Sequence, residues 1–231
     1  MICHPRKTAI VKKSLIFLLL ATPSTNLIAG TILIDLGSPN GTGTTPTTYE
    51  TPGNWNNITN STSGSATDLI DSDGNTTPFD IAVTSGFGST NNVHNGGSPS
   101  LTPSTASIDA FFSNSSTGST LTLSQLDPTL TYSFRFFASV FRGDSISRNA
   151  RYTVGGSSVE LDPYNNSSTW SAPISGISPD VNGNIVIDVR QGLGNNGGNY
   201  LLGIVEITTV PEPASAFLGA LGLIPLLRRR R

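Results

Sequence analysis

The 231-residue sequence has almost no cysteine or histidine. Cys3 and His4 lie at the extreme N-terminus, so the rest of the chain has no cysteine and a single histidine, His94. A disulfide framework, a zinc site built from cysteine or clustered histidine, and a cysteine nucleophile are therefore excluded there. A Ser-His-Asp triad would need His94, which lies in a polar loop rich in Asn and Gly, without a nucleophile motif.

Lysine is also missing from most of the chain. Between Thr31 and Thr209, five arginines stand against 14 acidic residues and give a formal charge of −9, whereas the whole chain carries −2. The difference arises because eight of the 13 basic residues lie close to the two ends. Nucleic acids and anionic lipids attract positive charge, so neither is an expected partner of this middle segment.

Residues 1–30 have the features of a secretory signal peptide. A basic stretch over residues 6–13 precedes an apolar run over residues 15–21, and the small residues Ala29 and Gly30 follow. The apolar run is too short to span a bilayer. We therefore expect a signal helix that the Sec machinery recognises, with cleavage near Ala29.

The C-terminal segment, residues 210–231, has three features in a fixed order. Pro211, Glu212 and Pro213 come first, then an apolar stretch of 14 residues that we expect to be a short helix, then four arginines. Each proline fixes its own φ and disfavours helix in the residue before it, so Glu212 should be presented in an extended segment. The apolar stretch is shorter than the ~20 residues that a straight membrane span needs.

This order of features resembles the PEP-CTERM sorting signal of Gram-negative bacteria that make exopolysaccharide. The resemblance implies recognition by an exosortase, a membrane-embedded protease or transpeptidase that cuts at the Pro-Glu-Pro segment after transient insertion into the inner membrane. The basic cluster would hold the C-terminus on the cytoplasmic side; it consists of Arg228, Arg229, Arg230 and Arg231. The alternatives are a permanent tail anchor and a soluble amphipathic tail. Sorting would place the mature protein on the cell surface or in the extracellular matrix.

The middle segment, residues 31–209, predicts an all-β domain. It has no long stretch of helical period, and clusters of Gly, Pro, Asn and Ser recur about every ten residues, as in a β-sandwich or a barrel. Of these, we expect a β-sandwich of the jelly-roll type. The clearest strand is 132–141, in which alternate residues from Tyr132 to Val140 form one apolar face. A further strand is predicted over 168–174. The first strand, 31–36, is expected to pair with the last, 201–208.

Several segments of this domain resemble galactose-binding-like jelly-roll modules of PEP-CTERM proteins and secreted polysaccharide-active enzymes. They are residues 31–37, 53–59, 69–74, 132–141 and 199–207. The resemblance implies non-catalytic binding or structuring of exopolysaccharide. The alternatives are a secreted carbohydrate-active enzyme and a purely structural surface or biofilm component. No pair of carboxylates is singled out as catalytic, so no catalytic residue is assigned.

Trp55 and Asn56 are the best candidates for contacts with a sugar. An aromatic face takes the C–H side of a pyranose, and neighbouring amides hydrogen-bond its hydroxyls. The alternative is a buried tryptophan that closes the first hairpin over the core.

Arg135 belongs to a second candidate group, because four of the five middle arginines fall within 17 residues. They are Arg135, Arg142, Arg148 and Arg151. Together they could grip uronate or sulfate groups of an acidic polysaccharide. The alternative is pairing with nearby carboxylates, for which Asp144, Glu160 and Asp162 are the candidates.

Asp71 and Asp73 stand in the sequence Asp-Ser-Asp-Gly-Asn, which alternates oxygen ligands with a turn glycine. A structural calcium ion is the one cofactor that this pattern suggests. The pattern lacks the rest of an EF-hand loop, and an Asx turn without metal is the alternative.

Overall fold

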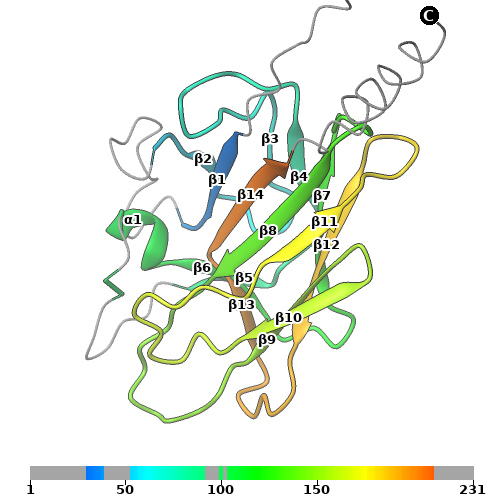
Figure 1. The fold of residues 1–231 in the computed structure, drawn as a ribbon. Coiled ribbons are helices and arrows are strands. Elements are labelled where there is room, and N and C mark those ends of the chain that lie inside the picture. The colour runs from blue at the N-terminus through cyan, green and yellow to red at the C-terminus, as the bar shows by residue number, and fades with distance from the viewer. Residues whose placement is uncertain (1–29, 39–52, 92–98, 101–102, 211–231) are drawn as a thin grey trace, which may run out of the picture.

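The computed structural model describes residues 30–38, 53–91, 99–100 and 103–210. Nearly every element in this part of the chain is a strand, as the turn-rich sequence predicts (Figure 1). The elements are β1 (Thr31–Leu36), β2 (Asn56–Ile58), β3 (Ser65–Ala66), β4 (Asp80–Ser85), β5 (Ser89–Asn91), α1 (Ser104–Ser107), β6 (Ala110–Ser113), β7 (Ser119–Ser124), β8 (Thr131–Phe137), β9 (Ala150–Val154), β10 (Ser157–Leu161), β11 (Ile174–Ile177), β12 (Ile185–Gln191), β13 (Tyr200–Leu202) and β14 (Ile204–Val210).

Two main sheets pack face to face around one core, which confirms the predicted β-sandwich. The five-stranded sheet has the order β11-β8-β14-β1-β2, and the six-stranded sheet has the order β10-β9-β12-β7-β4-β3. Between β7 and β14 the chain passes repeatedly from one sheet to the other, as in a jelly roll. A smaller sheet, β13-β6-β5, adjoins them.

The first strand pairs with the last, as predicted, but the last strand does not have the predicted bounds 201–208. Leu201 and Leu202 belong to β13, which pairs with β6, and β14 begins only at Ile204. β1 lies antiparallel to β14, with Thr31 opposite Thr208 and Ile34 opposite Val205. The Gly30 amide donates a hydrogen bond to the Thr209 hydroxyl over 2.9 Å, so the pairing continues to the end of the ladder. Residues 1–29 and 211–231, which hold the predicted signal and sorting segments, lie outside the described residues. Within the described part, no helix is long and apolar enough to cross a membrane.

Strand β8 carries the apolar face that its period-two pattern predicts. Tyr132, Phe134 and Phe136 are fully buried between the two sheets. The Phe136 ring stacks on the Tyr152 ring of β9 with 4.5 Å between centroids. The Tyr152 hydroxyl donates a hydrogen bond to the Leu201 carbonyl over 2.7 Å, and burial raises its pKa. The centre of the core therefore joins both main sheets to the small one.

The predicted extent of this strand is wrong, because β8 ends at Phe137 and not at residue 141. Beyond Phe137 the chain leaves β14 and aligns with another segment, where Val140 and Tyr164 form a parallel bridge. Val140 remains buried, but in a small cluster with Ala138 and Leu201 outside the main core. The apolar alternation continues through Ala138 and Val140, which are buried in this second cluster, so periodicity alone could not locate the end of β8.

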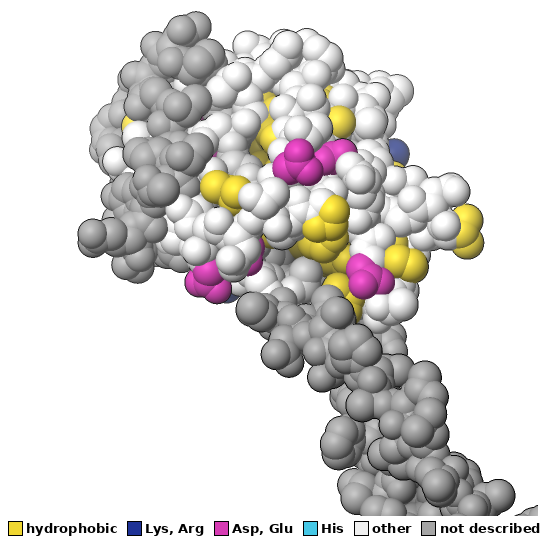
Figure 2. Space-filling model, turned by 90° about the horizontal axis from the view of Figure 1, so that it is seen from above, with side chains coloured by type: hydrophobic (Ala, Val, Ile, Leu, Met, Phe, Trp, Pro, Cys, Tyr) yellow, Lys and Arg dark blue, Asp and Glu magenta, His cyan; other side chains and the backbone are white. Residues whose placement is uncertain are grey.

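The surface of the molecule is mostly uncharged. On the face shown in Figure 2, white neutral polar groups and backbone predominate, and acidic side chains lie in separate places. Only 12% of the sequence is charged. Polar contacts at such a surface come mainly from hydroxyl and amide groups, and from the few charged side chains.

Candidate functional site

Trp55 lies in the core, at 1% exposure. Its ring packs in a cluster with Leu33, Phe137 and Ile204 on the outer side of the five-stranded sheet. No ring face is open to a sugar in this arrangement. The geometry favours the buried interpretation of Trp55 over the sugar-contact interpretation.

Asn56 is also buried, and its side chain hydrogen-bonds to the backbone. Its side-chain Nδ2 donates to the Leu33 carbonyl over 3.1 Å and to the Ile70 carbonyl over 2.8 Å, while Oδ1 accepts from the Ile70 amide over 2.9 Å. Asn56 thus links β1 and β2 to the segment around Ile70. Its amide has a structural use and is not presented to a ligand.

Arg135 lies on the outer face of the five-stranded sheet. Its guanidinium forms a two-pronged ion pair with Glu206, with both N–O distances at 2.8 Å. The hydrogen bond to Glu206 raises the arginine pKa, and the Cζ atom lies 5.1 Å from the centre of the Trp170 ring. Arg135 is therefore engaged by a partner that the sequence analysis did not consider.

The four neighbouring arginines do not form one positive patch. Arg151 lies on the outer face of the six-stranded sheet, on the opposite side of the sandwich from Arg135, because the inward positions of β9 are Ala150 and Tyr152. Arg148 is buried and pairs with Asp144, so the predicted carboxylate pairing is confirmed for this residue. Proximity in sequence failed as a guide because β8 and β9 belong to different sheets.

The Asp71 loop forms an Asx turn. Asp71 Oδ1 accepts hydrogen bonds from the Asp73 amide over 3.0 Å and the Asn75 amide over 2.7 Å, and the Asn75 side chain donates to both carboxylate oxygens. Within the described residues, no group of three or more His, Cys, Asp or Glu side chains is placed to hold a metal. The geometry favours the Asx-turn interpretation over the calcium interpretation.

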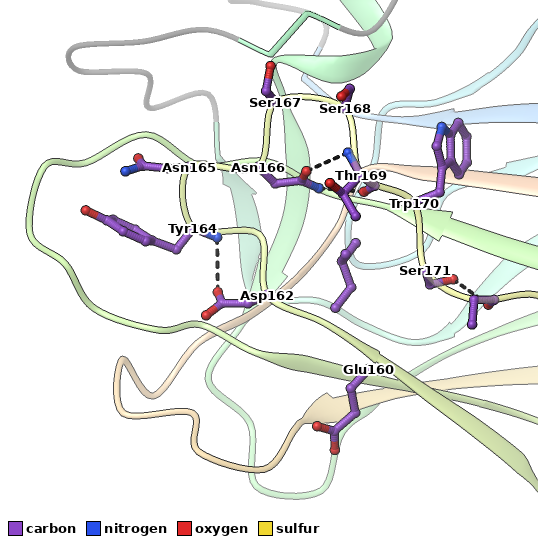
Figure 3. A pocket seen from close by; sticks show the side chains of 12 residues that line it. Glu160, Asp162, Tyr164, Asn165, Asn166, Ser167, Ser168, Thr169, Trp170 and Ser171 are labelled. Atoms are coloured by element: carbon purple, nitrogen blue, oxygen red, sulfur yellow. Dashed lines mark hydrogen bonds between the residues drawn. The ribbon is translucent and has the colours of Figure 1, made fainter.

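A depression lies elsewhere, along the segment from β10 to β11 (Figure 3). It has a volume of about 540 Å³ and is lined by residues 160–162 and 164–172. Most of its lining is hydroxyl, amide and carboxylate. Tyr164 and Trp170 lie toward opposite ends of the segment in Figure 3. We call residues 162–172 the polar loop.

Two buried side chains hold the polar loop against the end of β8. Asn166 Nδ2 donates to the carbonyls of Ala138 and Thr169 over 2.9 and 2.8 Å, and its Oδ1 accepts from the Thr169 amide over 2.8 Å. Ser171 donates its amide to the Phe136 carbonyl over 2.9 Å and accepts from the Phe136 amide through Oγ over 3.0 Å. The loop is therefore fixed at two points by buried side chains that hydrogen-bond to the backbone of β8 and of the residue that follows it.

The neighbours of Asn166 and Ser171 in the polar loop are exposed or half-buried. Asn165, Ser168 and Thr169 face solvent, and Trp170 is half-buried. Trp170 is supported from beneath by Phe137, whose ring centre lies 5.7 Å away. Asn165 has a φ of +49°, a left-handed conformation that Asn tolerates better than most residues. The result is a preorganised row of one amide, that of Asn165, and the hydroxyls of residues 167–169, which ends at a supported aromatic ring.

Two carboxylates line the same depression, and both are used by the scaffold. Asp162 Oδ1 accepts from the Arg148 amide over 3.1 Å and the Tyr164 amide over 3.0 Å. Glu160 accepts from the Asn149 side chain over 2.6 Å and the Leu193 amide over 3.0 Å. Their contacts hold turns in place, and Figure 3 shows the two side chains well apart.

The sequence offers Trp170 and Tyr164 only as weaker candidates for sugar contacts, and it did not single out this loop because residues 168–174 were predicted to be a strand. That prediction is wrong, since β11 begins only at Ile174. The available signal was the run from Asp162 to Trp170, in which Asn, Ser and Thr stand between two aromatic residues. A dense polar run bounded by aromatics indicates a shaped loop rather than a half-buried strand.

Comparison with known proteins adds little beyond the general architecture. No protein-family model matches the sequence, and no curated protein matches it. Among solved structures, the chain is similar to the protein YXIM of Bacillus subtilis (15% identity, TM-score 0.41, 79% of this chain and 40% of that one). It is also similar to the plant receptor-like kinase ANX2 (12%, 0.42, 66% and 54%). A third similarity is to CBM35 from Cellvibrio japonicus Abf62 (16%, 0.29, 55% and 87%). The chain thus spans about half or less of the first two proteins, and its function must be argued from its own residues.

Proposed function

We propose that the domain binds hydroxyl-rich carbohydrate at the polar loop, without catalysing a reaction. The observation that carries this proposal is the exposed row that runs from the Asn165 amide through the hydroxyls of residues 167–169 to Trp170, held in place by the buried Asn166 and Ser171. Because the loop is already fixed, little conformational freedom is lost when a ligand binds.

The chemistry of the row matches a sugar. Amides and hydroxyls donate and accept hydrogen bonds at the same time, as do the vicinal hydroxyls of a pyranose. The exposed part of the Trp170 indole can contact the apolar C–H side of the ring. Each contact is weak alone, so recognition would come from several contacts together. The volume of the depression, about 540 Å³, lies within the range that is usual for small-ligand sites.

We also propose that the chain is exported and sorted. Support comes from the sequence alone: the signal-like segment at residues 1–30, and the Pro-Glu-Pro, apolar and basic features at residues 210–231. Export by the Sec machinery and processing by an exosortase would deliver the domain to a surface or matrix that contains polysaccharide. Mass spectrometry of the secreted protein tests this, since intact residues 214–231 would contradict processing.

Binding is tested by affinity electrophoresis against polysaccharides and by a glycan array. Two variants address the loop: Trp170→Ala removes the aromatic surface, and Asn165→Gly removes an amide while keeping the left-handed backbone without strain. Asn182→Gly is the matched control, because Asn182 is exposed in a turn beyond the other end of β11.

The expected result is retardation of the native protein and of Asn182→Gly by at least one neutral polysaccharide, with retardation reduced in both loop variants. Far-UV circular dichroism establishes that the variants are folded. Equal retardation of all four proteins would place binding elsewhere, and no retardation by any glycan would overturn the proposal.

A further inference from the structure

A second depression lies on the outer face of the six-stranded sheet. It has a volume of about 290 Å³, and its lining consists of Ser115, Ser116, Arg151, Arg190 and Gln191. Arg151 of β9 and Arg190 of β12 are direct cross-strand partners, so both side chains project from the same face. The two serines come from the turn that leads into β7. The depression therefore brings two guanidinium groups beside two hydroxyl groups.

The two arginines differ in how their charge is balanced. Arg190 forms a two-pronged ion pair with Asp188, at N–O distances of 2.5 and 2.8 Å, and this contact raises its pKa. For Arg151, by contrast, none of the residues that the structure describes forms an ion pair or hydrogen bond with the guanidinium. Like charges placed directly across two strands are unfavourable without compensation.

The acidic residue closest in register does not supply that compensation. Glu160 of β10 is the cross-strand partner of Arg151 on its other side. Its carboxylate instead accepts hydrogen bonds from the Asn149 side chain and the Leu193 amide. Those contacts turn Glu160 toward the loop after β12, so Arg151 keeps its hydrogen-bonding groups available.

The depression also has a defined wall. Gly118 precedes β7 with a φ of +87°, a conformation that favours glycine. A Cβ atom at this position would lie only 2.8 Å from Cγ of Arg190. The glycine thus allows the stem of Arg190 to lie close against the turn that carries the two serines.

We propose that this depression binds a carboxylate or sulfate group of an acidic polysaccharide, with Arg151 as its principal contact. The planar guanidinium matches a two-oxygen anion and binds it through two parallel hydrogen bonds. Ser115, Ser116 and Gln191 supply neutral groups for adjoining hydroxyls. This site rests on the proposed carbohydrate-binding function; it takes a charged class of ligand and is distinct from the polar loop.

The test uses the full-length protein in affinity electrophoresis at ~0.15 M salt, where distant charges are screened. Polygalacturonate and dextran sulfate serve as acidic probes, and unmodified dextran serves as the neutral probe. The variant is Arg151→Gln, which removes the charge but keeps a polar chain. The matched control is Arg142→Gln, because Arg142 is also exposed and its loss changes net charge equally.

The expected result is that Arg151→Gln weakens binding of an acidic polysaccharide at least about tenfold, while Arg142→Gln changes it less than about twofold. Inorganic sulfate at millimolar concentration should compete only weakly, because a free ion lacks the hydroxyl contacts. Equal binding by both variants, or complete displacement by millimolar sulfate, would overturn the polysaccharide assignment.

The two proposals fail separately. Loss of acidic binding in Trp170→Ala but not in Arg151→Gln would leave the polar loop as the binding site and remove this second one. Loss in Arg151→Gln alone, with neutral binding intact, would establish the second site beside the first.

Discussion

Replacing Asn56 by alanine should destabilise the fold without altering the binding surface. The side chain makes three hydrogen bonds to the backbone, at 2.8 to 3.1 Å, and is only 9% exposed. Each such bond contributes a net ~0.5 to 1.5 kcal/mol, and buried partners left unsatisfied raise the loss. The expected decrease in the free energy of unfolding is therefore about 3 kcal/mol, a large share of the ~5 to 15 kcal/mol typical of a domain.

The assay is equilibrium unfolding in guanidinium chloride, followed by tryptophan fluorescence. The denaturation midpoint of Asn56→Ala should fall while the m-value is unchanged. Asn182→Ala is the control, since an exposed turn residue should change stability by less than ~0.5 kcal/mol. A loss below ~0.5 kcal/mol in Asn56→Ala, or lost glycan binding at native stability, would refute the structural role of Asn56.

Three other predictions follow from the same geometry. Tyr152→Phe should lower the free energy of unfolding by ~1 to 3 kcal/mol, because the Leu201 carbonyl loses its buried donor; thermal unfolding measures this. The Arg148 guanidinium lowers the pKa of Asp144 from its ordinary value to about 2. This pair therefore stabilises the fold fully above the unfolded-state pKa of ~3.8, and the contribution is lost as the pH falls toward 2. A midpoint near 4 in an NMR titration of the Asp144 carboxyl group would contradict this prediction. Chelation with EDTA should leave the melting temperature unchanged, since both Asp71 oxygens accept hydrogen bonds within their own turn; a fall of several degrees would restore the calcium interpretation.

The sequence predicts the strands well where burial imposes a period of two. Tyr132, Phe134 and Phe136 point into the core as their spacing requires, and β1 pairs with β14 as expected of a jelly roll. The site was not predictable in the same way. Asn166 donates a hydrogen bond to the carbonyl of Ala138, 28 positions earlier. The sequence pattern near either residue does not predict that hydrogen bond. Its existence depends on the completed fold.

The same limitation explains why the sequence left two interpretations open for Trp55 and for the arginines. A tryptophan followed by an asparagine can belong to a sugar site, or to a core in which the buried asparagine hydrogen-bonds to the backbone. Only the hydrogen bonds of Asn56 to Leu33 and Ile70 separate the two. Likewise, Arg135 and Arg151 are close in sequence but lie on opposite faces, because the intervening chain crosses from one sheet to the other.

The overall charge of the domain sharpens the proposal for Arg151. With a formal charge of −9 between Thr31 and Thr209, the domain repels an acidic polysaccharide at long range. The Debye length is ~30 Å at 0.01 M salt and ~10 Å at 0.1 M, so this repulsion extends furthest at low salt. A short-range contact at Arg151 survives moderate screening and weakens only when the screening length approaches ~3 Å at 1 M. Once both basic ends have been removed by the proposed processing, binding of polygalacturonate should therefore be weaker at 0.01 M than at 0.15 M salt and weak again at 1 M. A steady gain in affinity down to 0.01 M would indicate counterion release from a broad basic surface, and would contradict a single arginine contact on an acidic domain.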